Sequence, residues 1–149
     1  MGAYMKIIIE DIKDGEEESI TIRSNNIDDH ILQMIYGIKM NKKKAIGMYE
    51  GQIYMIDPTD IYYFEAVDNK VFIYCDKKVY ESKLKLYEIE KDYENTDFFR
   101  ASKSIILNLS KIRNLSPAFN GRFEALLKNK EKVIISRQFV PELKKKLGL

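Results

Sequence analysis

Cationic and hydroxyl side chains adjoin two short β-forming stretches in the second half of the sequence. The first group runs from Arg100 to Ser104 and leads into the apolar residues 105–107, and the second is Arg137, which directly follows residues 133–136. Guanidinium and ammonium groups donate hydrogen bonds to phosphates and to the acceptor atoms of guanine. A strand can hold such groups rigidly at its end. Both stretches are therefore candidates for contacts with phosphates and bases.

The formal charge is divided unevenly along the chain. Residues 99–149 hold 12 Lys and Arg against 3 Asp and Glu, a net charge of +9, whereas residues 1–98 hold 13 against 20, a net charge of −7. The whole-chain charge of +2 conceals this separation. A basic segment of this kind indicates an anionic partner such as nucleic acid. The alternative is a β-rich interaction adaptor whose basic half binds an acidic protein partner.

The composition limits the class of protein. A chain of 149 residues fits one domain, with or without an N-terminal elaboration, and ten Tyr and seven Phe with only seven Gly are typical of a globular, β-rich chain. No apolar run approaches the roughly 18 residues that span a bilayer, and the N-terminus lacks the pattern of a signal peptide. We therefore expect a cytoplasmic protein without a membrane partner.

Residues that support catalysis or metal binding are scarce. Cys75 is the only cysteine and His30 the only histidine, so neither a disulfide nor a metal cluster is expected. The sequence also lacks a glycine-rich phosphate loop and a nucleophile beside a base. We expect no enzymatic activity, no catalytic residue, no cofactor and no small-molecule substrate.

The first 56 residues predict a small α+β extension. Two isoleucine-rich stretches, 5–10 and 19–23, flank the acidic turn 14–18 and predict a hairpin. An apolar stripe between residues 27 and 38, followed by lysines, predicts an amphipathic helix. The remainder predicts a second hairpin, with strands at 45–49 and 52–56.

Residues 57–149 predict a mainly β module with a few helices. Short apolar stretches separated by turns such as Asp68-Asn69 and Asn120-Gly121 favour antiparallel strands in meander order. One helix, capped by Ser82, is expected to run through Tyr93, and another is expected near the C-terminus, with Pro141 near its start. The predicted strands are 61–66, 70–75, 78–81, 104–107, 112–115, 122–127 and 132–136.

This pattern resembles the LytTR family of bacterial DNA-binding domains. The resemblance runs from Asp57 to Leu149. Its parts are, in order, Asp60-Ile61-Tyr62-Tyr63-Phe64-Glu65, residues 84–93, Phe99-Arg100-Ala101-Ser102-Lys103-Ser104-Ile105-Ile106-Leu107-Asn108-Leu109 with Ile112, Ile135-Ser136-Arg137, and Leu143-Lys144. It implies an elongated fold of small antiparallel β sheets, in which loops rather than a recognition helix enter successive major grooves of duplex DNA.

The resemblance also implies roles for particular residues. Base contacts fall to Asn69 and Lys70 in one turn, to Lys103 in the next matching stretch, and to Arg137. Contacts to phosphates, or to the loop itself, fall to Arg100, Ser102, Ser104 and Asn108. Many family members carry histidine at the position of Ser102 and valine at that of Leu107, which bears on the choice of bases.

Further cations of the basic half are candidates for phosphate contacts, which supply most of the affinity of proteins for duplex DNA. These cations are Lys111, Arg113, Lys128, Lys130 and Lys132. For Lys128 and Lys130 the alternative is a solvated hairpin tip.

Most familiar LytTR regulators carry a receiver domain ahead of this module, and residues 1–56 are too few to form one. We therefore interpret the chain as a standalone relative of response regulators, with an extension at 1–56 and a DNA-binding domain at 57–149. The expected partner is double-stranded DNA, bound by a homodimer on repeated half-sites, because one module buries too little surface for regulatory affinity. A single-stranded nucleic-acid binder is a weaker alternative, since it would need exposed aromatic side chains among the cations.

Overall fold

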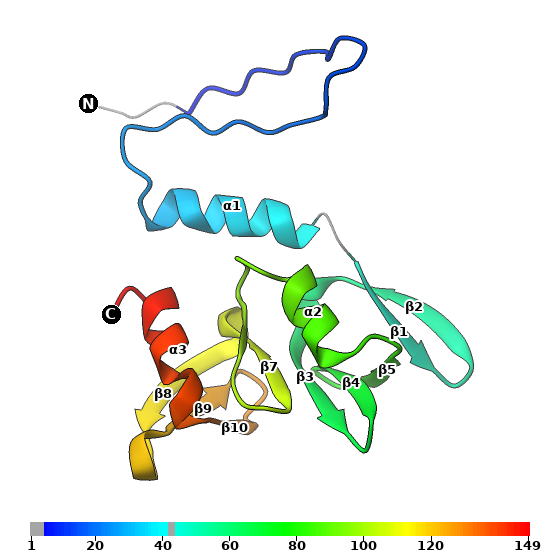
Figure 1. Cartoon of the computed structure of the whole chain (residues 1–149), viewed down its shortest axis with the longest axis vertical. Helices are drawn as coiled ribbons and strands as arrows, with labels where there is room; N and C mark the ends of the chain where they lie inside the picture. Colours follow the sequence, from blue (N-terminus) through cyan, green and yellow to red (C-terminus); the bar gives the residue numbers. More distant parts are fainter. Residues whose placement is uncertain (1–4, 42–43) are drawn as a thin grey trace.

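The computed structural model describes residues 5–41 and 44–149, apart from the side chains of residues 39–41 (Figure 1). This part of the chain holds ten strands in two antiparallel sheets, with short helices along their edges, so the predicted mainly β fold is confirmed. The strands are β1 (Ala45–Tyr49), β2 (Gln52–Ile56), β3 (Ile61–Val67), β4 (Lys70–Cys75), β5 (Val79–Ser82), β6 (Phe98–Arg100), β7 (Ile105–Asn108), β8 (Ile112–Pro117), β9 (Phe123–Leu127) and β10 (Lys132–Ile135). The helices are α1 (Asp29–Asn41), α2 (Leu86–Asp92) and α3 (Val140–Lys146), with single 3-10 turns η1 (Pro58–Asp60), η2 (Leu109–Lys111), η3 (Phe119–Gly121) and η4 (Arg137–Phe139).

The larger sheet has the strand order β2-β1-β5-β4-β3-β7-β6. Its inner strand β3 pairs with β4 through Phe64 and Ile73 and with β7 through Phe64 and Ile106. Every pairing is antiparallel, as expected for short strands joined by tight turns. The smaller sheet has the order β10-β9-β8.

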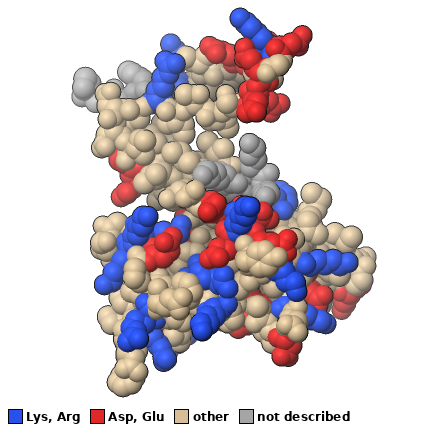
Figure 2. Space-filling view, in the orientation of Figure 1, with Lys and Arg blue, Asp and Glu red and all other residues tan. Residues whose placement is uncertain are grey.

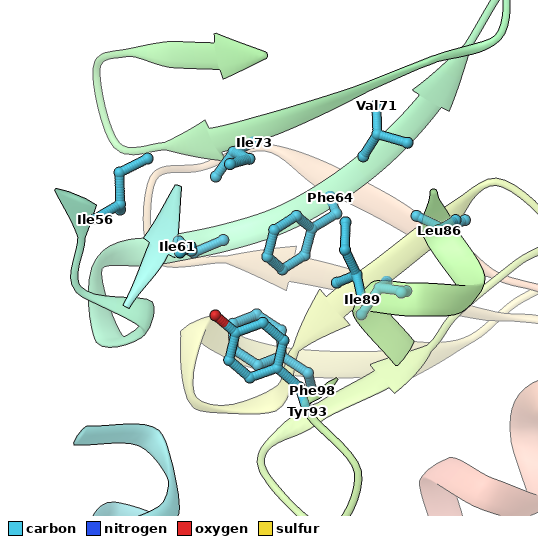
Figure 3. Packing of buried hydrophobic residues seen from close by; sticks show 11 residues of the cluster. Ile56, Ile61, Phe64, Val71, Ile73, Leu86, Ile89, Tyr93 and Phe98 are labelled. Atoms are coloured by element: carbon cyan, nitrogen blue, oxygen red, sulfur yellow. The ribbon is translucent and has the colours of Figure 1, made fainter. Parts of the chain in front are cut away.

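Side chains from the larger sheet pack on both of its faces, because successive residues of a strand point in opposite directions. On β3, β6 and β7 the residues Phe64, Phe98 and Ile106 belong to one core. Their neighbours Phe99 and Leu107 belong to a second core. Figure 3 shows Phe64 of the first core beside Ile89 of α2, and Phe98 next to Tyr93, which follows the helix, with ring centres 4.9 Å apart.

Helix α2 begins at Leu86 with Lys85 as its N-cap, three residues after the predicted cap Ser82. Ser82 is the last residue of β5, and its hydroxyl accepts a hydrogen bond from the Leu84 N–H inside the turn. The Glu88 carboxylate instead accepts the Lys85 N–H at 3.0 Å and holds the first turn of the helix. Leu86 and Ile89 then face the first core.

The second core lies between the larger sheet and the smaller one. Alternate residues of β9 and β10 point into it, and α3 closes one side with Val140 and Leu143. The buried members from the smaller sheet are Ala125, Leu127, Val133 and Ile135.

The hairpin predicted for residues 5–10 and 19–23 is wrong, because neither stretch forms a strand. Both stretches are extended and exposed, and the one backbone hydrogen bond recorded in this segment closes the turn, from Glu16 N–H to Lys13 C=O at 3.0 Å. The predicted amphipathic helix does form, as α1, and its Ile31 is buried. The Ile31 N–H donates to the Asp28 carboxylate at 3.0 Å, which caps its first turn.

The second predicted hairpin, β1 and β2, is confirmed and forms one edge of the larger sheet. β1 pairs with β5 at Met48 and Glu81, so the sheet continues across the expected boundary between residues 56 and 57. The division into an extension and a module at that point stays a prediction. Within the described residues, no helix is long and apolar enough to cross a membrane.

Candidate nucleic-acid interface

Three loops that carry predicted base contacts lie next to one another. The Ser136 N–H, just before Arg137, donates to the Ala101 C=O at 2.8 Å and ties the end of β10 to the β6–β7 loop. The Ala66 N–H donates to the Ser104 C=O at 2.8 Å and ties the other side of that loop to the end of β3. The β6–β7 loop is therefore the middle one of three, between the β3–β4 turn and Arg137.

The β3–β4 turn is a two-residue turn that fits its sequence. Asp68 and Asn69 both adopt positive φ, 50° and 66°, and Val67 pairs with Lys70 across the turn. Asp and Asn tolerate this conformation better than most residues. Asn69 and Lys70 are exposed, and the Lys70 ammonium lies 3.6 Å from the Glu81 carboxylate. An exposed pair of this kind is weak and leaves Lys70 able to change partners.

The β6–β7 loop is held by Arg100. Its Nε donates to the Ser102 C=O at 3.0 Å, its Nη2 donates to the Lys103 C=O at 2.7 Å, and its Nη1 lies 3.1 Å from the Glu90 carboxylate. The planar guanidinium suits this double contact, which a lysine could not reproduce. Arg100 thus fixes the backbone at Lys103 and leaves the Lys103 side chain exposed. Of the two roles considered for Arg100, the structure favours holding the loop.

The two serines of this loop also organise its backbone. The Ser104 N–H donates to the Ser102 hydroxyl at 3.3 Å, and the two hydroxyl oxygens lie 3.5 Å apart. Both residues are only partly exposed. Their hydroxyls retain some access to solvent, so phosphate contacts from Ser102 and Ser104 stay predictions.

Arg137 is exposed at the rim of a cleft of about 590 Å³. The turn before β9 supports its side chain, since a Cβ at Gly121 would lie 2.9 Å from the Arg137 Cδ. Asn120 and Gly121 both adopt positive φ, as the Asn-Gly pair predicted. The cleft is lined by Asn120, Arg122, Ser136, Arg137 and Gln138.

Sequence reasoning missed Arg122 and Gln138 as members of this site. Both are exposed beside Arg137, and the described residues offer the Arg122 guanidinium no ion-pair partner. The signal for Gln138 was its place directly after Arg137. Arg122 could be found only once β9 and η4 were known to lie together.

The prediction that Asn108 contacts a phosphate is wrong, because Asn108 is fully buried and cannot reach one. Its Nδ2 donates to the Ile61 C=O at 2.8 Å. Its Oδ1 accepts the Ser110 N–H at 3.0 Å and the Ser110 hydroxyl at 2.8 Å. Asn108 therefore joins the start of β3 to the turn after β7, which is a structural role.

The predicted phosphate contacts differ in how free their cations are. The Lys128 N–H donates to the Lys111 C=O at 3.0 Å, which places these two residues side by side. The Lys111 ammonium also lies 5.1 Å from the centre of the Tyr62 ring. Lys132 pairs with Glu124 at 3.5 Å. Arg113, Lys128 and Lys130 are exposed, and no ion pair to them is recorded in the described residues.

Charged side chains of the two signs are distributed unevenly over the face shown in Figure 2, although they mix in its middle and at its lower right. Figure 2 shows Lys and Arg gathered over the lower left of the molecule, where Figure 1 places α3 and the smaller sheet. Acidic side chains gather at the tip of the N-terminal segment, at the opposite end. The gathering of cations at the lower left therefore lies over the C-terminal part of the chain.

A metal-binding cluster is not assembled in the described residues. No three His, Cys, Asp or Glu side chains there are grouped so that they could hold a metal ion. Burial raises the pKa of the Cys75 thiol to about 11, which keeps it protonated at neutral pH. The site is thus made of cations, amides and hydroxyls.

Comparison with known proteins agrees with this architecture. Residues 51–148 match the model of the LytTr DNA-binding domain. The chain belongs to the LytTR family of DNA-binding domains, which confirms the resemblance seen in the sequence. The solved LytTr DNA-binding domain of a methyl-accepting/DNA response regulator from Bacillus cereus has the same fold, with a TM-score of 0.68 and 22% identity over 72% of this chain and 98% of that chain.

Two relatives illustrate different lengths. The sensory transduction protein LytT of Enterococcus faecalis is 38% identical over 109 residues, and the match covers 72% of this chain but 45% of that protein. An uncharacterized HTH-type transcriptional regulator of Staphylococcus aureus strain MRSA252 is 29% identical over 141 residues, 93% of this chain and 95% of that protein. In the described part of this chain, strands separate the three helices, so none of them forms a helix-turn-helix pair with another.

Proposed function

We propose that this protein is a transcriptional regulator that binds specific duplex DNA through its three adjacent loops. The observation that carries the proposal is the pair of hydrogen bonds that tie the β6–β7 loop to β3 and to the residue before Arg137. They place exposed cations at three neighbouring points on a rigid scaffold. Rigid placement matters because base contacts discriminate by geometry, at about 1–3 kcal/mol for each good bidentate pair.

Each loop has a distinct part in the proposed recognition. Arg137 reads one end of the site with its planar guanidinium, and Asn69 and Lys70 read the other end. Lys103 lies between them because its loop does. Arg113, Lys128 and Lys130 contact phosphates, with a smaller share from Lys111, whose ammonium also faces Tyr62.

We further propose that two copies bind repeated half-sites in the cytoplasm, without an enzymatic step, a cofactor or a small-molecule substrate. The supporting argument is energetic, since a single small module buries too little surface to reach the affinity usual for regulators. The names of the relatives, a sensory transduction protein and a transcriptional regulator, support the same class. The family match also favours DNA over the acidic protein partner of the adaptor alternative.

Fluorescence anisotropy with a selected duplex tests the proposal over a salt series. We expect Lys103→Ala and Arg137→Ala each to weaken specific binding by about 1–3 kcal/mol. The matched control is Lys91→Ala, which removes an exposed lysine from α2 and should leave affinity unchanged. The assignment is wrong if both loop variants bind like the wild type, or if the control loses as much.

A further inference from the structure

The N-terminal segment, residues 5–28, exposes several large apolar side chains that no other part of the described chain covers. Its exposed fractions reach 83% at Ile7, 65% at Ile8 and 92% at Ile9, and 70% at Ile20 on the second arm. Both arms are extended, and their backbone groups form no strand ladder. A β-branched stretch with open backbone donors and acceptors is a template for another strand.

The two arms of one copy are poor partners for each other at their charged positions. The turn closed between Lys13 and Glu16 sets the register in which the arms would pair. In that register Asp11 lies opposite Glu18 and Lys6 lies opposite Arg23, so like charges meet at both ends. Like charges directly opposite each other destabilise an antiparallel pair. This conflict accounts for the missing hairpin despite the isoleucines between these positions.

The first arm is instead complementary to a second copy of itself. An antiparallel pair related by a two-fold axis at Ile8 places Lys6 opposite Glu10 of the other copy, twice. The same register places Ile7 opposite Ile9 and Ile8 opposite itself, so the contacts from residue 6 to residue 10 bring together opposite charges or two apolar side chains, and only the end pair, Met5 and Asp11, does not. A contact of this kind is self-complementary, as the interface of a two-fold dimer must be.

We propose that residues 5–11 pair with the same residues of a second copy and form the dimer contact of this protein. Residues 5, 7 and 9 of both copies then lie on one face with Asp11 at each end, and Ile20 and Ile22 of the second arms cover its apolar middle, because an isolated two-stranded ribbon is only marginally stable. The need for two copies rests on the proposed function. The contact itself is argued only from the exposure and the charges of the N-terminal segment.

The placement of the segment is compatible with DNA binding by both copies. Figure 1 shows it beyond α1, at the end of the long axis opposite to the β3–β4 turn. The match to the staphylococcal regulator spans 141 residues, longer than the matched module, and therefore includes part of the extension. A contact at this end joins two modules and leaves both sets of loops open.

Analytical ultracentrifugation of the full chain without DNA tests the contact. We expect Lys6→Glu and Glu10→Lys each to weaken dimerisation about tenfold or more, because each places like charges opposite each other twice. The double variant, Lys6→Glu with Glu10→Lys, should restore the dimer, because it exchanges the two charges and again places opposite charges across the contact. The control Lys13→Glu changes the net charge as Lys6→Glu does, but it lies within the turn and should leave the dimer intact.

Several outcomes would overturn this contact. They are a wild-type chain that stays monomeric at about 100 μM, far above regulatory affinities, single variants that dimerise normally, and a double variant that is not restored. Measuring how each variant binds a duplex with a single half-site separates the test of the dimer contact from the test of the proposed function. All of these variants should bind one half-site like the wild type, whereas a dimer that binds no duplex would refute the DNA proposal alone.

Discussion

At the scale of single residues, the described site contains cations in two roles. Arg100 is bound on three sides, by Glu90 and by two loop carbonyls, whereas Lys103 and Arg137 are exposed. A bound cation shapes the loop and a free one can reach DNA. These roles should be separable in the salt dependence of binding, because only a phosphate contact releases counterions.

Arg100→Lys should weaken specific binding about tenfold while leaving the salt slope nearly unchanged. A lysine keeps the charge but cannot hold the carbonyls of Ser102 and Lys103 together. Anisotropy at four or more salt concentrations measures both quantities. A slope that falls by about 0.9 in Arg100→Ala, which removes the charge, would instead show that Arg100 contacts a phosphate.

Asn108→Ala should lower the free energy of unfolding by about 2–3 kcal/mol. The substitution leaves the buried Ile61 C=O and the Ser110 N–H without their partner, and each unsatisfied group costs about 1–3 kcal/mol. Urea unfolding followed by circular dichroism gives the value, with Asn114→Ala as the exposed control. Unchanged stability together with weaker DNA binding would restore the phosphate role.

Cys75 should react slowly with thiol reagents in the folded protein. Its pKa, raised by burial to about 11, lies above the ordinary value of 9.0, so the reactive thiolate is about a hundredfold scarcer at pH 7. The rate should rise with pH up to that value and should jump on unfolding in urea. Rapid modification of the native protein at pH 7 would contradict this environment.

At the scale of elements, the turn before β9 supports the side chain that follows β10. Gly121 adopts a φ of 73°, and its missing Cβ leaves room for the Arg137 stem. This arrangement couples two loops that lie far apart in the sequence. The effect of a Cβ at Gly121 on DNA recognition can be measured apart from its effect on backbone strain, because Gly51 has a similar positive φ and open space around it.

Gly121→Ala should reduce DNA affinity beyond its loss of stability. The control is Gly51→Ala, which has a φ of 76° but open space where a Cβ would lie. Both variants should lose about 1–2 kcal/mol of stability from left-handed backbone strain. Only Gly121→Ala should also move Arg137 and weaken binding in the anisotropy assay. Equal affinities for the two variants would show that the turn does not position Arg137.

Much of this element structure was predictable, because apolar alternation and turn residues mark the strands from β1 to β10. The three-residue β6 was missed, since it is too short to show a pattern. The start of α2 was misplaced because Ser82 can cap a helix or end a strand, and only tertiary pairing decides. The hairpin at 5–23 failed because β propensity does not supply a compatible partner strand.

At the scale of the whole molecule, two cores fix the orientation of all three loops. Both faces of β3, β6 and β7 are buried, so the loops at their ends cannot rotate independently. The family and the main cations could be predicted because they follow contiguous patterns. The burial of Asn108 and the cleft around Arg122 could not be predicted, since each depends on segments that are distant in the sequence.

Selection of bound sequences from random duplex DNA tests the central claim most directly. With the wild-type chain the account predicts a defined motif whose contacts follow the order of the loops. Arg137→Ala should erase preference at one end, Lys70→Ala at the other, and Lys103→Ala between them. No recovered motif, or the same motif from all three variants, would contradict recognition through these loops.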